Sequence, residues 1–137
     1  MTLAGSGLRF GLAIWAAATA LFVPFGHFAF GPDNRLPVAL MVTLVVAGTF
    51  VAVSAFARAV LLRNAATTYE AAALLGVSAA LPGLLLDGVL YAIGSGRYPG
   101  LDDAASGAMT ATLLLAYAVA LLAPLNVTRM RRIVKHS

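Results

Sequence analysis

The stretch Leu81–Tyr91, LPGLLLDGVLY, places one carboxylate, Asp87, in an apolar run that also contains a proline and two glycines. A run of this kind is typical of a membrane-spanning helix. Ionisable side chains in such helices are costly and usually face the interior of a helix bundle. The stretch therefore predicts a helical membrane protein with Asp87 turned inward.

The composition of the whole chain supports this interpretation. Of 137 residues, 61% are hydrophobic and only 10% are charged, whereas about 25% of the residues in an average soluble domain are charged. A chain of this length usually forms one domain. Cysteine is absent, which excludes disulfides, thiolate metal sites and thiol nucleophiles. We therefore expect a single membrane domain over residues 1–137, without a soluble catalytic domain.

Four apolar stretches reach the length of about 20 residues that a helix needs to cross a bilayer. The expected spans are residues 10–30, 37–62, 71–94 and 104–127, followed by a basic cytoplasmic tail at 128–137. The short connections favour an all-α fold, an antiparallel four-helix transmembrane bundle, because irregular backbone in lipid leaves its polar groups unpaired. The first span is longer than the apolar core of a signal peptide, so we expect it to be retained.

The basic residues predict an orientation. Arg35 and Arg97 lie on one side, while the other seven of the nine Lys and Arg residues share the side of both termini. The positive-inside rule then places both termini in the cytoplasm of a bacterial cell, with the chain in the inner membrane. We expect the tail to bind anionic lipid headgroups through its cationic side chains, namely Arg129, Arg131, Arg132 and Lys135. Binding to nucleic acid is not expected, since no basic fold or aromatic platform accompanies these charges.

Small residues predict the packed helix faces. In the third span Gly76, Ala80 and Gly83 share a stripe with Asp87 at helical spacing, opposite a leucine-rich side. Small side chains let helix backbones approach in a membrane, so this stripe should face the bundle. In the first span we expect Ala16 and Ala20 to form the packed face, together with His27.

A polar layer follows from these faces. Asp87 and His27 are the main candidates for a ligand or proton site, and further candidates at similar depth are Tyr91, Thr110 and Thr43. In one interpretation Asp87 binds a proton or cation with the help of His27. In the other, Asp87 fixes the helix register by hydrogen bonding, and His27 reaches the headgroup region. Sequence alone leaves both interpretations open, as it does a contact between His27 and Asp87.

The segment at residues 95–103, SGRYPGLDD, combines turn-forming residues with the charged side chains Arg97, Asp102 and Asp103. We interpret it as a tight external turn in which Tyr98 anchors the chain at the membrane interface. The alternative is a lid over the polar layer.

The stretch LPGLLLDGVLY, followed by YPGL at residues 98–101, is similar to a bacterial family of four-helix integral membrane proteins of uncharacterised function. The resemblance is specific only around these two segments. It implies a four-helix inner-membrane fold, with no assigned activity, cofactor or substrate.

The sequence is compatible with two functions. The first is a small transporter or ligand-binding membrane protein that uses the buried carboxylate of Asp87, with an unknown small-molecule ligand. The alternative is a non-enzymatic accessory or scaffold subunit of a larger membrane complex. We expect no cofactor, metal or enzymatic activity, because no metal-ligand cluster or activated nucleophile is visible. Association with the lipid bilayer and with copies of itself or other subunits is expected, since small-residue stripes supply contact surfaces.

Overall fold

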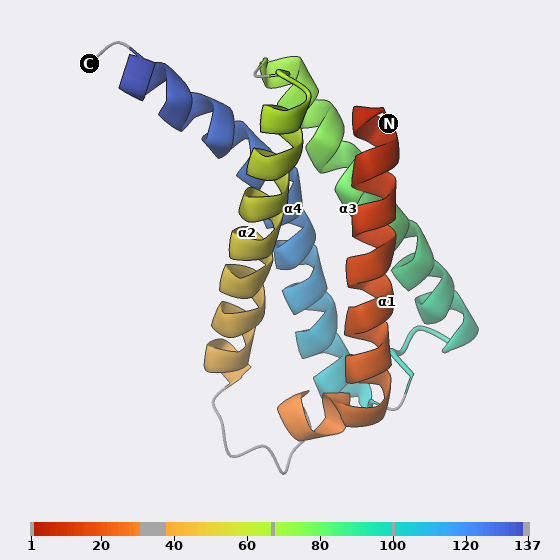
Figure 1. Ribbon diagram of the computed structural model, residues 1–137. Coiled ribbons are helices and arrows are strands. Elements are labelled where there is room, and N and C mark those ends of the chain that lie inside the picture. The colour runs from red at the N-terminus through yellow and green to blue at the C-terminus, as the bar shows by residue number, and fades with distance from the viewer. Residues whose placement is uncertain (1, 31–37, 67, 100, 136–137) are drawn as a thin grey trace.

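The computed structural model describes residues 2–30, 38–66, 68–99 and 101–135, and it describes their side chains apart from those of residues 27 and 129–135. The described residues form four α-helices and no strand (Figure 1), which confirms the predicted all-α class. The helices are α1 (Leu3–Phe30), α2 (Val38–Arg63), α3 (Tyr69–Ile93) and α4 (Asp103–Lys135). Helix α4 continues into the segment predicted as a separate tail.

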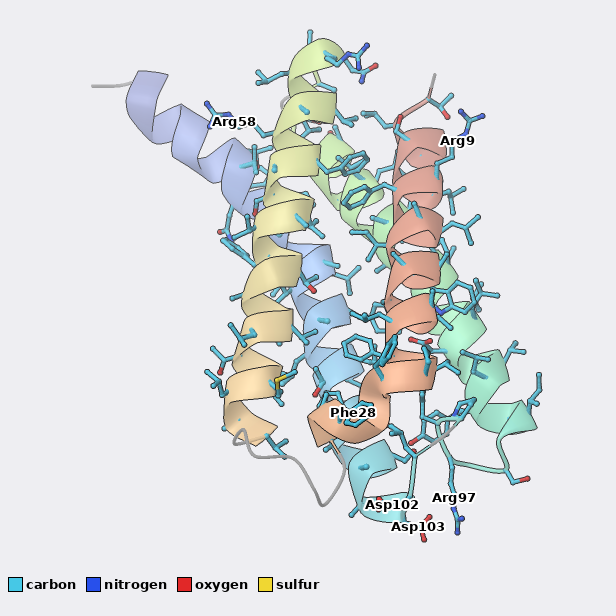
Figure 2. All side chains as sticks on the ribbon, turned by 60° about the horizontal axis from the view of Figure 1, so that its bottom comes forward. Arg9, Phe28, Arg58, Arg97, Asp102 and Asp103 are labelled. Atoms are coloured by element: carbon cyan, nitrogen blue, oxygen red, sulfur yellow. The ribbon has the colours of Figure 1, made fainter. Side chains whose placement is uncertain are left out.

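Each helix contains a segment long and apolar enough to cross a membrane, so the chain has the character of a multi-pass membrane protein. The charged side chains of Arg97, Asp102 and Asp103 gather at one end of the bundle, and Arg9 and Arg58 lie toward the other (Figure 2). The four candidate spans are Leu3–Gly26, Val38–Arg63, Tyr69–Ile93 and Asp103–Thr128.

The helices do not pack in chain order. Helix α3 packs against α1 and α4, and α4 packs against α2, whereas the consecutive helices α1 and α2 barely contact each other. In Figure 1, α1 and α2 stand in front, with α4 visible behind the space between them. The four helices therefore surround an interior that is weakly closed on the side of α1 and α2.

Two glycines of α1 permit its close contact with α3. A Cβ atom on Gly7 would overlap the side chain of Ser78, and one on Gly11 would overlap the carbonyl oxygen of Ala79. Larger residues at these positions would push the backbones apart, so the glycines set the separation of the two helices. The residue numbers of the contacts increase along both helices, so α1 and α3 run in the same direction.

Helix α3 approaches α4 through glycines on its other buried edge. A Cβ atom on Gly76 would lie 2.7 Å from the carbonyl oxygen of Leu121, and one on Gly83 would lie 2.6 Å from the hydroxyl oxygen of Tyr117. The residue numbers of these contacts increase along α3 and decrease along α4, so the two helices run in opposite directions. Ala80 is also buried on this side of α3.

The opposite side of α3 faces outward, as the leucine-rich pattern indicates. Leu85 and Ile93 are 62% and 76% exposed. In a membrane these side chains would contact lipid, which adds apolar surface without a hydration cost.

The structure places the packed face of α1 differently from the sequence prediction. Ala16 and Ala20 are exposed on the outer surface, whereas Gly11, Trp15 and Ala18 face the bundle. The difference has a physical reason. The predicted span began at residue 10 and so omitted Gly7, and the glycine contacts with α3 rather than the alanines fix the rotation of α1 about its axis.

Proline bends the end of α1 across one end of the bundle. Pro24 lies inside the helix, where it cannot donate a backbone hydrogen bond, and the last turns of α1 swing sideways in Figure 1. This bend brings Phe30 into a buried cluster with Tyr98 and Leu101 of the α3–α4 connection. Tyr98 is only 2% exposed, so the prediction that it anchors the chain at the membrane interface is wrong.

Candidate functional site

Asp87 lies on α3 and is 9% exposed. Its carboxylate accepts a hydrogen bond from the indole Nε1–H of Trp15 in α1, with an N–O distance of 2.8 Å. The hydroxyl of Tyr117 in α4 donates to the other carboxylate oxygen. Three helices therefore meet at one acidic group, and the two donors offset part of the cost of removing a carboxylate from water.

Tyr98 adds a second polar pair beside this carboxylate. Its hydroxyl forms a side-chain hydrogen bond with Thr19 of α1, and burial raises its pKa, with the charge of Asp87 adding to the effect. The backbone N–H of Tyr98 donates to Oγ of Ser106 at 2.7 Å. These bonds explain why Tyr98 turns inward: the loop residue places a neutral hydroxyl inside the bundle and pairs its backbone at the start of α4.

A cavity of about 90 Å³ lies between the four helices, with Asp87 on its wall. Most of the lining side chains are apolar, and among the described lining residues Asp87 alone carries a carboxylate. None of the described lining residues is Lys, Arg or His. The lining residues with polar side-chain atoms are Trp15, Thr19, Thr49, Asp87, Tyr98 and Tyr117.

The cavity is least closed between α1 and α2. Both helices line the cavity, with Ile14 and Ala18 from α1 and Val45 from α2, yet they barely contact each other. One bridge between them is an aromatic stack of Phe10 on Phe56, with ring centroids 3.8 Å apart. The side of the bundle between these two helices is therefore its least closed side, and in a membrane it would face lipid.

Other predicted site residues form a separate cluster. The hydroxyl of Tyr91 lies 3.0 Å from Oγ of Ser106 and also bonds to the hydroxyl of Thr110. Thr110 in turn donates to the carbonyl oxygen of Ser106 at 2.7 Å. This cluster joins α3 to the first turns of α4, and its members do not line the cavity beside Asp87.

Thr43 is exposed on α2, and its hydroxyl donates to the carbonyl oxygen of Ala39 within the same helix at 2.7 Å. The predicted polar layer thus divides into an Asp87 group, a Tyr91–Thr110 group and a separate Thr43. The side chain of His27 lies outside the described residues, so its contact with Asp87 stays a prediction. The same holds for the side chains of the tail, Arg129, Arg131, Arg132 and Lys135.

Sequence reasoning missed the two donors to Asp87, Trp15 and Tyr117. The spacing of α1 contains a usable signal, because Gly7, Gly11, Trp15 and Ala18 recur at steps of three and four residues and so share one face. The chain has a single tryptophan. Its position on a glycine-marked face is the feature that points to the bundle interior.

The arrangement suits reversible binding of a small cation or proton at Asp87. In the part of the chain that the structure describes, no three His, Asp or Glu side chains come together to hold a metal ion. No protein-family model, curated protein or solved structure matches the chain.

Proposed function

We propose that this chain is a small-molecule-binding membrane protein of the transporter type, whose binding site is the cavity beside Asp87. The observation that carries the proposal is the position of this carboxylate on the wall of the cavity between the four helices. A carboxylate that served packing alone would need no space beside it. Each carboxylate oxygen accepts one bond from the residues that the structure describes, and a carboxylate has about four acceptor sites, so these bonds leave capacity for a ligand.

The proposal includes a membrane topology. We place the chain in a bacterial inner membrane as an antiparallel bundle with both termini in the cytoplasm. Arg9, Arg58 and Arg63 at the proposed cytoplasmic end support this orientation, against Arg97 at the other end, because basic residues are retained on the cytoplasmic side. Membership of the four-helix family of uncharacterised function would agree with this arrangement.

A second function is favoured by the hydrogen bonds themselves. Trp15 and Tyr117 tie α1 and α4 to Asp87 on α3, and polar bonds of this kind fix helix register in membranes. In an accessory or scaffold subunit this connection would be the whole role of Asp87, and the partner would bind to the outer helix faces.

Native mass spectrometry of the protein, extracted gently from its own membrane, distinguishes the two functions. The comparison uses the wild type, Asp87→Asn and the control Asp103→Asn, which makes the same chemical change in an exposed ion pair with Arg97. We expect a small molecule in stoichiometric amount with the wild type and with Asp103→Asn, but not with Asp87→Asn.

Two results would reject ligand binding at Asp87. One is a stoichiometric protein partner with no small molecule in any of the three samples, which would favour the accessory function. The other is a small molecule that stays bound in the folded Asp87→Asn protein.

A further inference from the structure

The cavity has features that select one class of ligand, and this inference rests on the proposed function. With Asp87 ionised the cavity carries one negative charge, and no described lining residue supplies a positive charge. An ionised carboxylate in an apolar environment is unfavourable without a counter-charge. The ligand that best completes the site is therefore a monovalent cation.

The lining favours an organic cation over a metal ion. Trp15, Tyr98, Tyr117 and Phe22 all line the cavity, and aromatic rings attract alkylammonium groups through their π faces. A bare divalent metal ion would need several oxygen ligands, and the described lining residues offer one carboxylate, that of Asp87, beside neutral hydroxyls. Because the carboxylate keeps unused acceptor sites, a protonated amine with N–H donors suits it better than a quaternary ammonium group.

The size of the cavity limits how much of the ligand it can hold. Its volume of about 90 Å³ is below the roughly 150 Å³ of a cavity that takes benzene and far below the roughly 300–1,000 Å³ of a pocket for a drug-sized ligand. An amine head with its first carbons fits, but a longer molecule must extend outside. The side between α1 and α2, where the two helices barely contact each other, offers an exit into the bilayer.

We propose that the cavity binds the protonated amino head of a single-chain alkylamine at Asp87, while the alkyl chain passes between α1 and α2 into the lipid. The amine donates to the carboxylate beside the bonds from Trp15 and Tyr117. The tail then lies where the bilayer would otherwise fill the space between the two helices.

The single tryptophan provides a direct measurement. Trp15 is the only tryptophan of the chain and bonds to Asp87, so its emission reports events at the carboxylate. The full chain, in nanodiscs of zwitterionic lipid, is titrated with dodecylamine, propylamine, dodecyltrimethylammonium and dodecanol. The concentration at the midpoint of the saturable emission change is compared between compounds. The amplitude of the change is not used, because it also depends on the surroundings of the indole.

We expect dodecylamine to bind more tightly than dodecyltrimethylammonium and propylamine, and dodecanol to give no saturable response. Asp87→Asn should weaken dodecylamine binding about ten- to hundredfold, the range expected for a hydrogen bond to a charged group, and Asp103→Asn should leave it unchanged. A second variant leaves Asp87 and its donors intact: Thr49→Phe fills the cavity from α2. It should weaken binding, whereas Val51→Phe on the exposed side of α2 should not.

Three results would overturn the inference. Dodecanol could bind with the midpoint of dodecylamine, Thr49→Phe could bind dodecylamine as the wild type does, or propylamine could bind while dodecylamine is rejected, as in a closed site. The alkylamines could show no binding in the titration while native mass spectrometry still finds a small molecule with the wild type but not with Asp87→Asn. In that case the proposed ligand class is wrong and the proposed function stands. If no alkylamine binds and native mass spectrometry finds no small molecule with the wild type, both proposals are rejected.

Discussion

Trp15 of α1 and Asp87 of α3 are joined by a hydrogen bond of 2.8 Å that spans 72 positions of the sequence. The bond is possible because Gly7 and Gly11 bring the two helix backbones together two turns and one turn, respectively, before Trp15. Close glycine packing and the placement of the indole N–H are therefore parts of one arrangement. The carboxylate in turn ties α1 to α4 through Tyr117.

The two donors to Asp87 should contribute to stability together. We expect Trp15→Phe and Tyr117→Phe each to lower the free energy of unfolding by about 1–3 kcal/mol, because each leaves a carboxylate oxygen without its partner. Unfolding in mixed detergent micelles, followed by circular dichroism, measures the change. The control repeats both substitutions in an Asp87→Asn background, where a double-mutant cycle should show smaller effects. Equal losses in both backgrounds would mean that the rings stabilise the fold by packing alone.

The glycine contacts between α1 and α3 should tolerate no side chain. Gly11→Ala places a Cβ atom against the carbonyl oxygen of Ala79, and backbone cannot move aside as a flexible side chain can. We expect a loss of about 1–3 kcal/mol, as for other overpacked sites, together with a changed Trp15 emission as α1 shifts. The matched control is Gly48→Ala on α2, where an added Cβ meets nothing within 4 Å. Comparable losses in both variants would contradict a specific α1–α3 contact.

The sequence alone predicts the four helices and the packed face of α3. Length and hydropathy predict four spans, and in α3 the small residues around Asp87 alternate with large exposed ones, so helical spacing predicts its burial. In α1 the same reasoning failed, because the many alanines and glycines of this helix mark more than one face as small. The face marked by Gly7, Gly11 and Trp15 is one of several small faces of α1, and only the contacts with α3 show that it is the packed one.

The partners of Asp87 were harder to predict for a related reason. Depth and facing placed Thr43 and Thr110 in one layer with Asp87, but depth along a helix does not show which helices pack together. In the structure α1 and α2 are separated, and Pro24 bends the end of α1. Both features follow from tertiary packing, so Trp15 and Tyr117 became visible as partners only once the helix pairs were known.

Tyr98 should stabilise the fold mainly by filling space. We expect Tyr98→Ala to cost about 3–5 kcal/mol, the range for a large buried aromatic side chain, and Tyr98→Phe about 0.5–1.5 kcal/mol for the hydrogen bond with Thr19. The unfolding measurement in detergent again provides the values, and Leu85→Ala on the exposed side of α3 is the control. Equal costs for the alanine and phenylalanine variants would show that the hydroxyl, not the ring, holds the loop.

The proposed topology can be tested with single cysteines, because the chain has none of its own. Asn64 lies in the described α2–α3 connection and Ser95 in the α3–α4 connection, and both are exposed. A membrane-impermeant maleimide added to intact cells should label Ser95→Cys and should label Asn64→Cys only after permeabilisation. Basic residues support this direction, since Arg58 and Arg63 precede Asn64 and translocating them would oppose the positive-inside rule. Labelling of Asn64→Cys alone in intact cells would reverse the orientation. Labelling of both would mean that α3 does not cross the membrane, and the proposed bundle topology would then be rejected.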